Sequence, residues 1–117
     1  MNPTEFIVKR FNVDPRYSNY VPVGWTGLFF ETLEKIKQID PNVKFIQIKE
    51  KFACLTVYFL SDKRDEINLV LKEAEKQSVE TCQICGYPGK VETVVHYMST
   101  LCATCYKTQI QNRKTNE

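Results

Sequence analysis

The sequence predicts an α+β fold, in which a small antiparallel sheet with two helices is followed by a short module organised by cysteines. Three observations support this prediction. Apolar residues recur at helical spacing over residues 25–39, apolar and polar side chains alternate over residues 54–60, and two Cys-x-x-Cys pairs come afterwards. The order helix, strand, strand, helix allows both helices to cover one face of the sheet.

The chain has 117 residues and a formal net charge of +2. This is the length of one ordinary domain, so we expect a small α+β domain over residues 1–78 with the cysteine module, residues 79–117, packed against it. No apolar run approaches the roughly 20 residues of a membrane span. Met1–Glu5 has no basic region before an apolar stretch, so we expect no signal peptide.

The first predicted helix covers residues 25–39, and Pro41 follows its end because proline disfavours helical geometry in the residue before it. Its apolar stripe consists of Leu28, Phe29, Leu33, Ile36 and Ile39. Before this helix, residues 1–24 contain three prolines and read as an irregular lead-in. We expect a short strand over Phe6–Phe11 in this segment.

Two strands are predicted next, over Val43–Phe52 and Cys54–Leu60, with a turn or bulge in Lys49–Ala53. The inward residues are expected to be Val43, Phe45 and Gln47 in the first strand, and Leu55, Val57 and Phe59 in the second. A second helix then begins after an N-cap at Ser61 or Asp62 and continues to about Gln77. Its apolar stripe consists of Ile67, Val70, Leu71 and Ala74.

The cysteine pairs are Cys82/Cys85 and Cys102/Cys105, separated by sixteen residues. Two such pairs at this spacing indicate a zinc site, because each short pair points both sulfurs at one centre and the segment between them brings the pairs together. Four thiolates complete a tetrahedral shell, so we expect one structural Zn²⁺. The alternatives are two redox dithiols, a pair of disulfides, or iron bound as in rubredoxin.

Within the module, Val91–Met98 is expected to form a strand and residues 103–112 a short helix. This would give a treble-clef-like finger, and a three-stranded zinc ribbon is the competing geometry. The fifth cysteine, Cys54, is expected to be a small core residue, since it lies in the middle of a predicted strand. An odd count of cysteines, mostly in Cys-x-x-Cys pairs, favours a reducing cytoplasm over a secreted disulfide scaffold.

The function classes that remain are those without catalysis. His96 is the only histidine, and it lacks the His-x-Glu context of zinc deaminases, so we expect no enzyme. Four zinc thiolates would bring the metal-loaded protein close to neutral, which argues against strong steering onto nucleic acid. The lysines at 44, 49 and 51, together with Glu50, are expected to form a solvated strand face, and the basic tail is a further solvated region. The tail residues are Lys107, Arg113 and Lys114.

A candidate partner surface is formed by the exposed aromatic and imidazole groups, because aromatic side chains commonly anchor protein interfaces. Its predicted members are Trp25, Tyr87, His96 and Tyr97. The solvent-facing side of the strands, with Gln47, Lys49, Thr56 and Tyr58, is the other surface that the predicted core leaves uncovered.

Several segments together resemble a group of small, uncharacterised zinc-binding proteins encoded by bacteriophages and prophages. The resemblance covers roughly residues 24–105, and it comprises Gly24-Trp25, the segment Gln47–Phe52, the run Thr81–Gly89 with its first cysteine pair, and Leu101–Cys105. It implies a viral or mobile-element origin, a bacterial host cytoplasm as the location, and no particular reaction.

We therefore expect a non-enzymatic zinc protein that binds a host protein, for example as an inhibitor of a host defence or regulatory system. Two alternatives are a nucleic-acid-binding zinc finger or ribbon, and a small-ligand sponge that uses the sheet face and Trp25.

Overall fold

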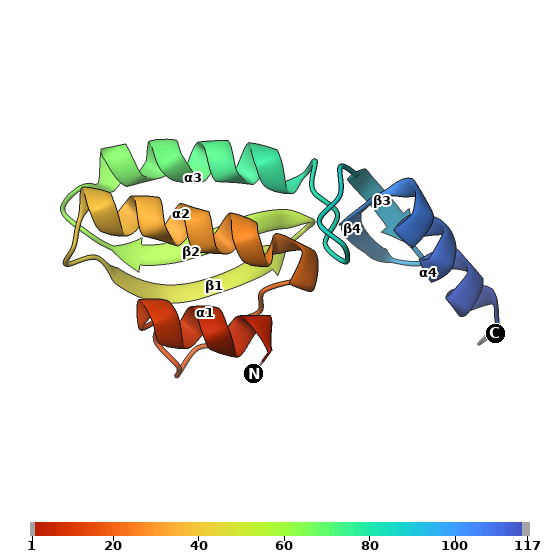
Figure 1. Ribbon diagram of the computed structural model, residues 1–117, viewed down its shortest axis with the longest axis horizontal. Helices are drawn as coiled ribbons and strands as arrows, with labels where there is room; N and C mark the ends of the chain where they lie inside the picture. Colours follow the sequence, from red (N-terminus) through yellow and green to blue (C-terminus); the bar gives the residue numbers. More distant parts are fainter. Residues whose placement is uncertain (1, 116–117) are drawn as a thin grey trace.

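The computed structural model describes residues 2–115, with side chains described as far as residue 112. It confirms the α+β class, with two separate two-stranded antiparallel sheets (Figure 1). The elements in order are α1 (Pro3–Phe11), the short 3₁₀ helix η1 (Val23–Trp25), α2 (Thr26–Ile39), β1 (Lys44–Lys51), β2 (Cys54–Leu60), α3 (Arg64–Ser78), β3 (Lys90–Val94), β4 (Tyr97–Leu101) and α4 (Ala103–Thr115).

The predicted strand over Phe6–Phe11 is wrong, because this segment is helix α1. Asn2 caps the helix by accepting a hydrogen bond from the Glu5 backbone N–H, and Pro3 occupies the first turn, where its missing N–H has no helical partner. Ile7 and Phe11, one turn apart, are both buried. The adjacent apolar residues suggest a strand, whereas the capping signal and the i, i+4 pair describe the helix that forms.

Helices α1, α2 and α3 pack beside the first sheet and enclose the larger of two apolar cores. The Phe11 ring lies edge-on to Phe30 of α2 and to Phe45 of β1, which ties α1 to both layers. Trp25, Phe29 and Leu33 are completely buried in the same core. Helix α3 begins at Arg64 rather than directly after the predicted cap, and Ser61 instead accepts a hydrogen bond from the Lys63 N–H.

Strands β1 and β2 form a hairpin with a two-residue turn at Phe52 and Ala53, both at positive φ. An irregularity between Phe45 and Gln47 shifts the pairing by one residue. The consequence is that Ile48, rather than the predicted Gln47, is the second inward residue of β1, and it is fully buried. In β2 the predicted alternation is confirmed, with Leu55 and Val57 buried.

The lead-in between α1 and η1 follows the outer edge of β1. The backbone N–H groups of Asp14 and Tyr20 donate to the carbonyls of Phe45 and Ile48, both at 3.0 Å. The Asn19 side chain accepts from the Ile48 N–H at 2.9 Å. This edge of the sheet is therefore satisfied by a segment that is not itself a strand.

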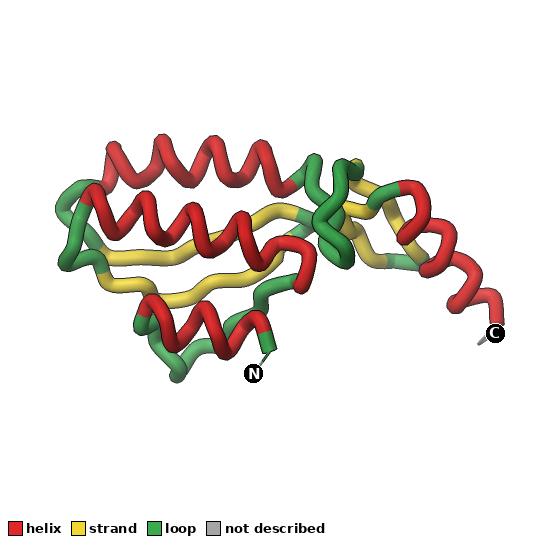
Figure 2. The backbone as a smooth tube through the Cα atoms, viewed as in Figure 1, coloured by secondary structure: helices red, strands yellow, loops and turns green. Residues whose placement is uncertain are grey.

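The molecule is elongated, with extents of 48 × 26 × 21 Å. The second sheet, β3–β4, and helix α4 extend away from the first domain and enclose a smaller apolar core built on Cys82, Val94 and Leu101. The loop that connects α3 to β3 lies between the two parts (Figure 2). The predicted boundary between residues 78 and 79 coincides with the end of α3 but stays a prediction.

Candidate metal centre

The fold brings together all four paired cysteines. The sulfur atoms of Cys82, Cys85, Cys102 and Cys105 lie within 4.8 Å of one another. The Cys85 and Cys102 sulfurs are 3.6 Å apart. Four sulfurs around one Zn²⁺ at about 2.3 Å would be separated by roughly 3.8 Å in a regular tetrahedron. The four cysteines could therefore bind one metal ion.

The first pair lies on a tight turn directly after α3. The Gly86 N–H donates to the Cys82 carbonyl at 3.0 Å, and the Cys82 N–H donates to the Tyr87 carbonyl at 2.7 Å. Gly86 has a φ of +84°, a left-handed conformation that a side chain would strain. This turn directs the sulfurs of Cys82 and Cys85 to the same side of the backbone.

The second pair is placed by the start of α4. Cys102 immediately precedes the helix, and its sulfur accepts a hydrogen bond from the Cys105 N–H at 3.4 Å. A thiolate at this position satisfies one of the free N–H groups of the first turn and faces the positive end of the helix dipole. The module therefore consists of the turn that carries Cys82 and Cys85 (the knuckle), the β3–β4 hairpin and helix α4. This order of elements is that of a treble clef, so the ribbon alternative does not describe this module.

The sulfurs strongly influence one another's ionisation. Burial opposes ionisation of Cys82, but backbone N–H groups of Cys85, Cys102 and Ile84 donate to its sulfur, and the net result is a Cys82 pKa lowered to about 6. Hydrogen bonding to the Cys102 sulfur, together with burial, raises the pKa of Cys105 to about 12. Four thiolates this close repel one another, and a divalent cation at their centre offsets that repulsion.

The knuckle is fixed to the first domain at Gly24, which precedes the buried Trp25. The Gly24 N–H donates to the Gln83 carbonyl at 2.8 Å. A Cβ at Gly24 would lie 2.1 Å from the Cys82 carbonyl oxygen and 2.7 Å from the Gly86 nitrogen. Backbone of the metal-binding turn therefore occupies the space where any side chain at position 24 would be.

Two further hydrogen bonds join the two parts, and a third, between Gln83 and Thr100, lies within the module. The Trp25 indole N–H donates to the Thr81 carbonyl at 2.7 Å. The Gln83 side-chain oxygen accepts from the Thr100 N–H, and the Thr100 hydroxyl donates to the Ala53 carbonyl at 3.1 Å. Thr100 is fully buried.

Sequence reasoning misses Gln83 and Thr100, which have no motif of their own. The one signal that could have found them is their position, since Gln83 lies inside the first cysteine pair and Thr100 is two residues before the second.

Three of the four residues of the candidate partner surface lie on the exterior of the molecule, while partner binding itself stays a prediction. Tyr87 and Tyr97 are 71% and 70% exposed, and His96 is also exposed, in the turn between β3 and β4. Trp25 does not belong to this surface, because its side chain is completely buried and its one polar atom is hydrogen bonded within the chain. A partner cannot reach it, and the same burial removes it as the platform of a small-ligand site.

Cys54, the fifth cysteine, is half-buried and lies away from the cluster. Its sulfur is 3.9 Å from the Ser78 hydroxyl, and burial raises the pKa of its thiol.

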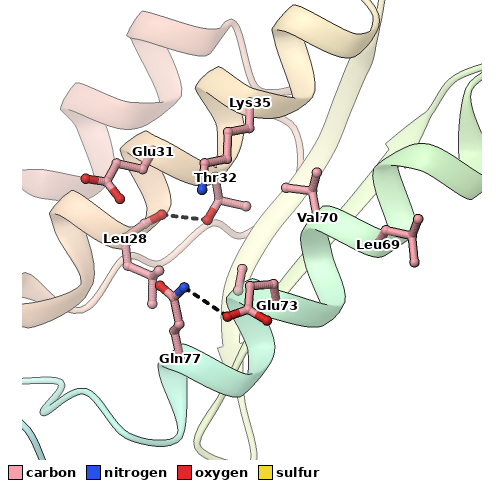
Figure 3. Close-up of a pocket in the computed structure, with 9 residues that line it drawn as sticks. Leu28, Glu31, Thr32, Lys35, Leu69, Val70, Glu73 and Gln77 are labelled. Carbon is pink, nitrogen blue, oxygen red and sulfur yellow. Dashed lines mark hydrogen bonds between the residues drawn. The ribbon is translucent and has the colours of Figure 1, made fainter.

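A shallow hollow of about 250 Å³ lies between α2 and α3, lined by aliphatic and charged side chains (Figure 3). Two of its polar groups already have partners, since the Thr32 hydroxyl donates to the Leu28 carbonyl and the Gln77 amide to the Glu73 carboxylate. The hollow is smaller than the usual 300–1,000 Å³ or so of a small-molecule site. Larger hollows, of about 430 and 440 Å³, lie beside the start of β1 and between β2 and α3.

Comparison of the chain with models of protein families, with curated proteins and with solved structures finds no match. Within residues 2–115, no helix combines the length and the apolar character needed to cross a membrane.

The close approach at Gly24 predicts that Gly24→Ala destabilises the protein. The added methyl group would overlap the knuckle backbone, and overpacking of this kind costs about 1–3 kcal/mol. The free energy of unfolding, measured by chemical denaturation, should fall by this amount. Gly27→Ala is the matched control, because nothing lies within 4 Å of its Cβ position and alanine favours a helix over glycine by up to about 1 kcal/mol. Equal stability of the two variants would show that the close approach is not tight.

Proposed function

We propose that this protein is a non-enzymatic zinc protein that acts by binding another protein, with one Zn²⁺ that stabilises the module carrying the binding surface. The observation that carries the proposal is the set of four converging sulfurs in a module that also carries exposed aromatic residues.

The donor set supports zinc. Thiolate is a soft ligand, and a tetrahedral arrangement of four sulfurs suits zinc or an iron centre. Bound zinc would be structural, since a catalytic zinc keeps one position for water or substrate and four cysteines leave none. Structural zinc contributes roughly 10 kcal/mol or more of apparent binding free energy in small fingers, which is ample to order a module with only a small apolar core.

The surface that supports protein binding lies on the zinc module and beside it. Tyr97, Ile84 and Tyr20 line a hollow of about 190 Å³ between the module and the lead-in. These three side chains are 70%, 42% and 53% exposed. Exposed aromatic rings around a concave site are typical of the residues that dominate the energy of protein interfaces. Tyr87, on the knuckle, extends the exposed aromatic set.

The resemblance to phage-encoded proteins supports a host protein as the class of partner, for example a component of a defence or regulatory system. A bacterial host cytoplasm is the matching location, because a reducing compartment keeps the cysteines free to bind metal.

Purified protein should contain close to one zinc per chain. Cys102→Ser should lose the metal. It should also become sensitive to proteolysis within residues 80–110, because no metal then links the two cysteine pairs that enclose this segment. Cys54→Ser is the control, since Cys54 lies outside the cluster, and it should retain one zinc. Iron in the purified protein, no metal at all, or equal depletion of metal in both variants would contradict a four-cysteine zinc site.

Partner binding should depend on the exposed tyrosines of the module. We expect the double variant Tyr87→Ser/Tyr97→Ser to lose a host protein that the wild type retains in an affinity pull-down. The control is Leu60→Ser/Leu69→Ser, which removes two other exposed apolar side chains, 54% and 69% exposed, on β2 and α3. Zinc content and thermal unfolding of each variant verify that it is folded. Retention of the same host protein by the tyrosine variant would refute this interface.

A further inference from the structure

One face of the first sheet lies away from the apolar core, and its side chains are half-buried or exposed. Cross-strand neighbours share a face, so the pairs Ile48↔Val57 and Glu50↔Leu55 belong to the side that packs against the helices. The alternating residues between them face the other way, and they are half-buried or exposed. On β1 and β2 these open-face residues are Lys44, Gln47, Lys49, Lys51, Thr56, Tyr58 and Leu60.

This face carries positive charge only. Lys44, Lys49 and Lys51 lie on it, and its other residues are uncharged. Glu50, expected from the sequence to accompany these lysines, is paired with the buried Leu55, and its carboxylate accepts a hydrogen bond from the Ala53 N–H at 2.8 Å. Successive residues of a strand face opposite sides, so Glu50 faces away from Lys49 and Lys51, and the bulge brings Lys44 to the same side as these two lysines.

Two carboxylates lie close to the edges of this face, and each has a basic neighbour. Asp14, beyond the β1 edge, forms an ion pair with Arg16 at 2.7 Å. Glu75 of α3 lines the groove along β2 together with Lys72. The open face keeps its excess of positive charge.

Aromatic rings accompany the lysines. Tyr58 is 42% exposed, and the Lys49 ammonium lies 5.5 Å from the centre of its ring. Phe52, 74% exposed, follows Lys51 at the hairpin turn. At the β1 edge, the Gln47 amide donates to the Ser18 carbonyl and so holds the lead-in beside this face, next to the exposed Tyr17.

From this arrangement we infer that the open face of the β1–β2 sheet binds single-stranded nucleic acid. Bases stack on Tyr58 and Phe52, while Lys49 and Lys51, about 7 Å apart as alternate residues of one strand, bind successive phosphates. Sites for single strands combine aromatic stacking platforms with positive charge along the backbone path. A duplex offers phosphates but no exposed base faces for the aromatic rings to stack on.

This binding activity goes beyond the proposed protein partner, and it uses a different surface from Tyr87 and Tyr97. The probe is a fluorescein-labelled poly(dT) strand of about 20 nucleotides, long enough for a site of the usual 4–16. Its binding is followed by fluorescence anisotropy at salt concentrations from about 50 to 200 mM. Competitors are unlabelled poly(dT), a duplex of the same length, and a polyglutamate peptide.

We expect the wild type to bind the probe and the duplex to compete poorly. Tyr58→Thr, which keeps a good strand-forming residue, should weaken binding at least fivefold or so, in line with the removal of one stacked base. Lys49→Gln/Lys51→Gln should reduce the salt slope by about 0.7 for each phosphate that the variant no longer neutralises. Lys35→Gln/Lys76→Gln is the control of equal charge change, because both lysines are exposed on the helices that cover the opposite face.

Four outcomes would overturn the inference. These are no binding of poly(dT) by the wild type at about 50 mM salt, tighter binding of the duplex, equal weakening by the two lysine pairs, and displacement of the probe by polyglutamate as readily as by poly(dT). The last result would assign the face to an acidic protein instead. Circular dichroism of each variant checks that weaker binding does not come from unfolding. Substitutions on the protein surface usually change stability little.

Discussion

The close approach of two backbone segments at Gly24 determines how the two parts of this molecule are joined. A metal-binding knuckle is compact because its sulfurs converge, and here its outer backbone lies directly against η1, where only glycine leaves room. The hydrogen bond from Gly24 to Gln83 and the indole hydrogen bond from Trp25 to Thr81 join adjacent residues of the first domain to the start of the knuckle. Both hydrogen bonds form with the backbone in the conformation that also directs the Cys82 and Cys85 sulfurs toward one centre.

The same junction also connects the two sheets. Ala53, in the turn of the first hairpin, is fully buried and its carbonyl accepts from Thr100 of β4, just before the second cysteine pair. Both cysteine pairs are thus tied to the first domain, one through Gly24 and one through Ala53. A metal that holds the pairs together would close this loop of interactions, and would thereby fix the orientation of the aromatic surface on the module relative to the lead-in that supplies Tyr20.

Sequence reasoning succeeds where the signal is local. The helical stripe over residues 25–39 and the alternation in β2 each follow the period of one element, and both are confirmed. The cysteine pairs have a fixed short spacing, and the structure brings all four sulfurs together as that spacing predicts. Sequence reasoning fails where the decisive partner is distant. The sequence is compatible with Trp25 as a core residue or as a partner residue, and the contact that distinguishes them, its acceptor Thr81, is 56 residues away in the sequence. The bulge between Phe45 and Gln47, which makes Ile48 rather than Gln47 an inward residue, likewise leaves no local mark in the sequence.

Hydrogen exchange of individual backbone amides most directly tests whether the metal site holds the two parts together. The amide of Gly24 should be well protected in zinc-loaded protein and should lose protection by at least tenfold when a chelator removes the metal. Amides in the middle of α2, such as Leu33, should keep most of theirs, because the core around them is built from the first domain alone. Unchanged protection at Gly24 after metal removal, or an equal decrease at Gly24 and Leu33, would contradict a junction that depends on the four cysteines.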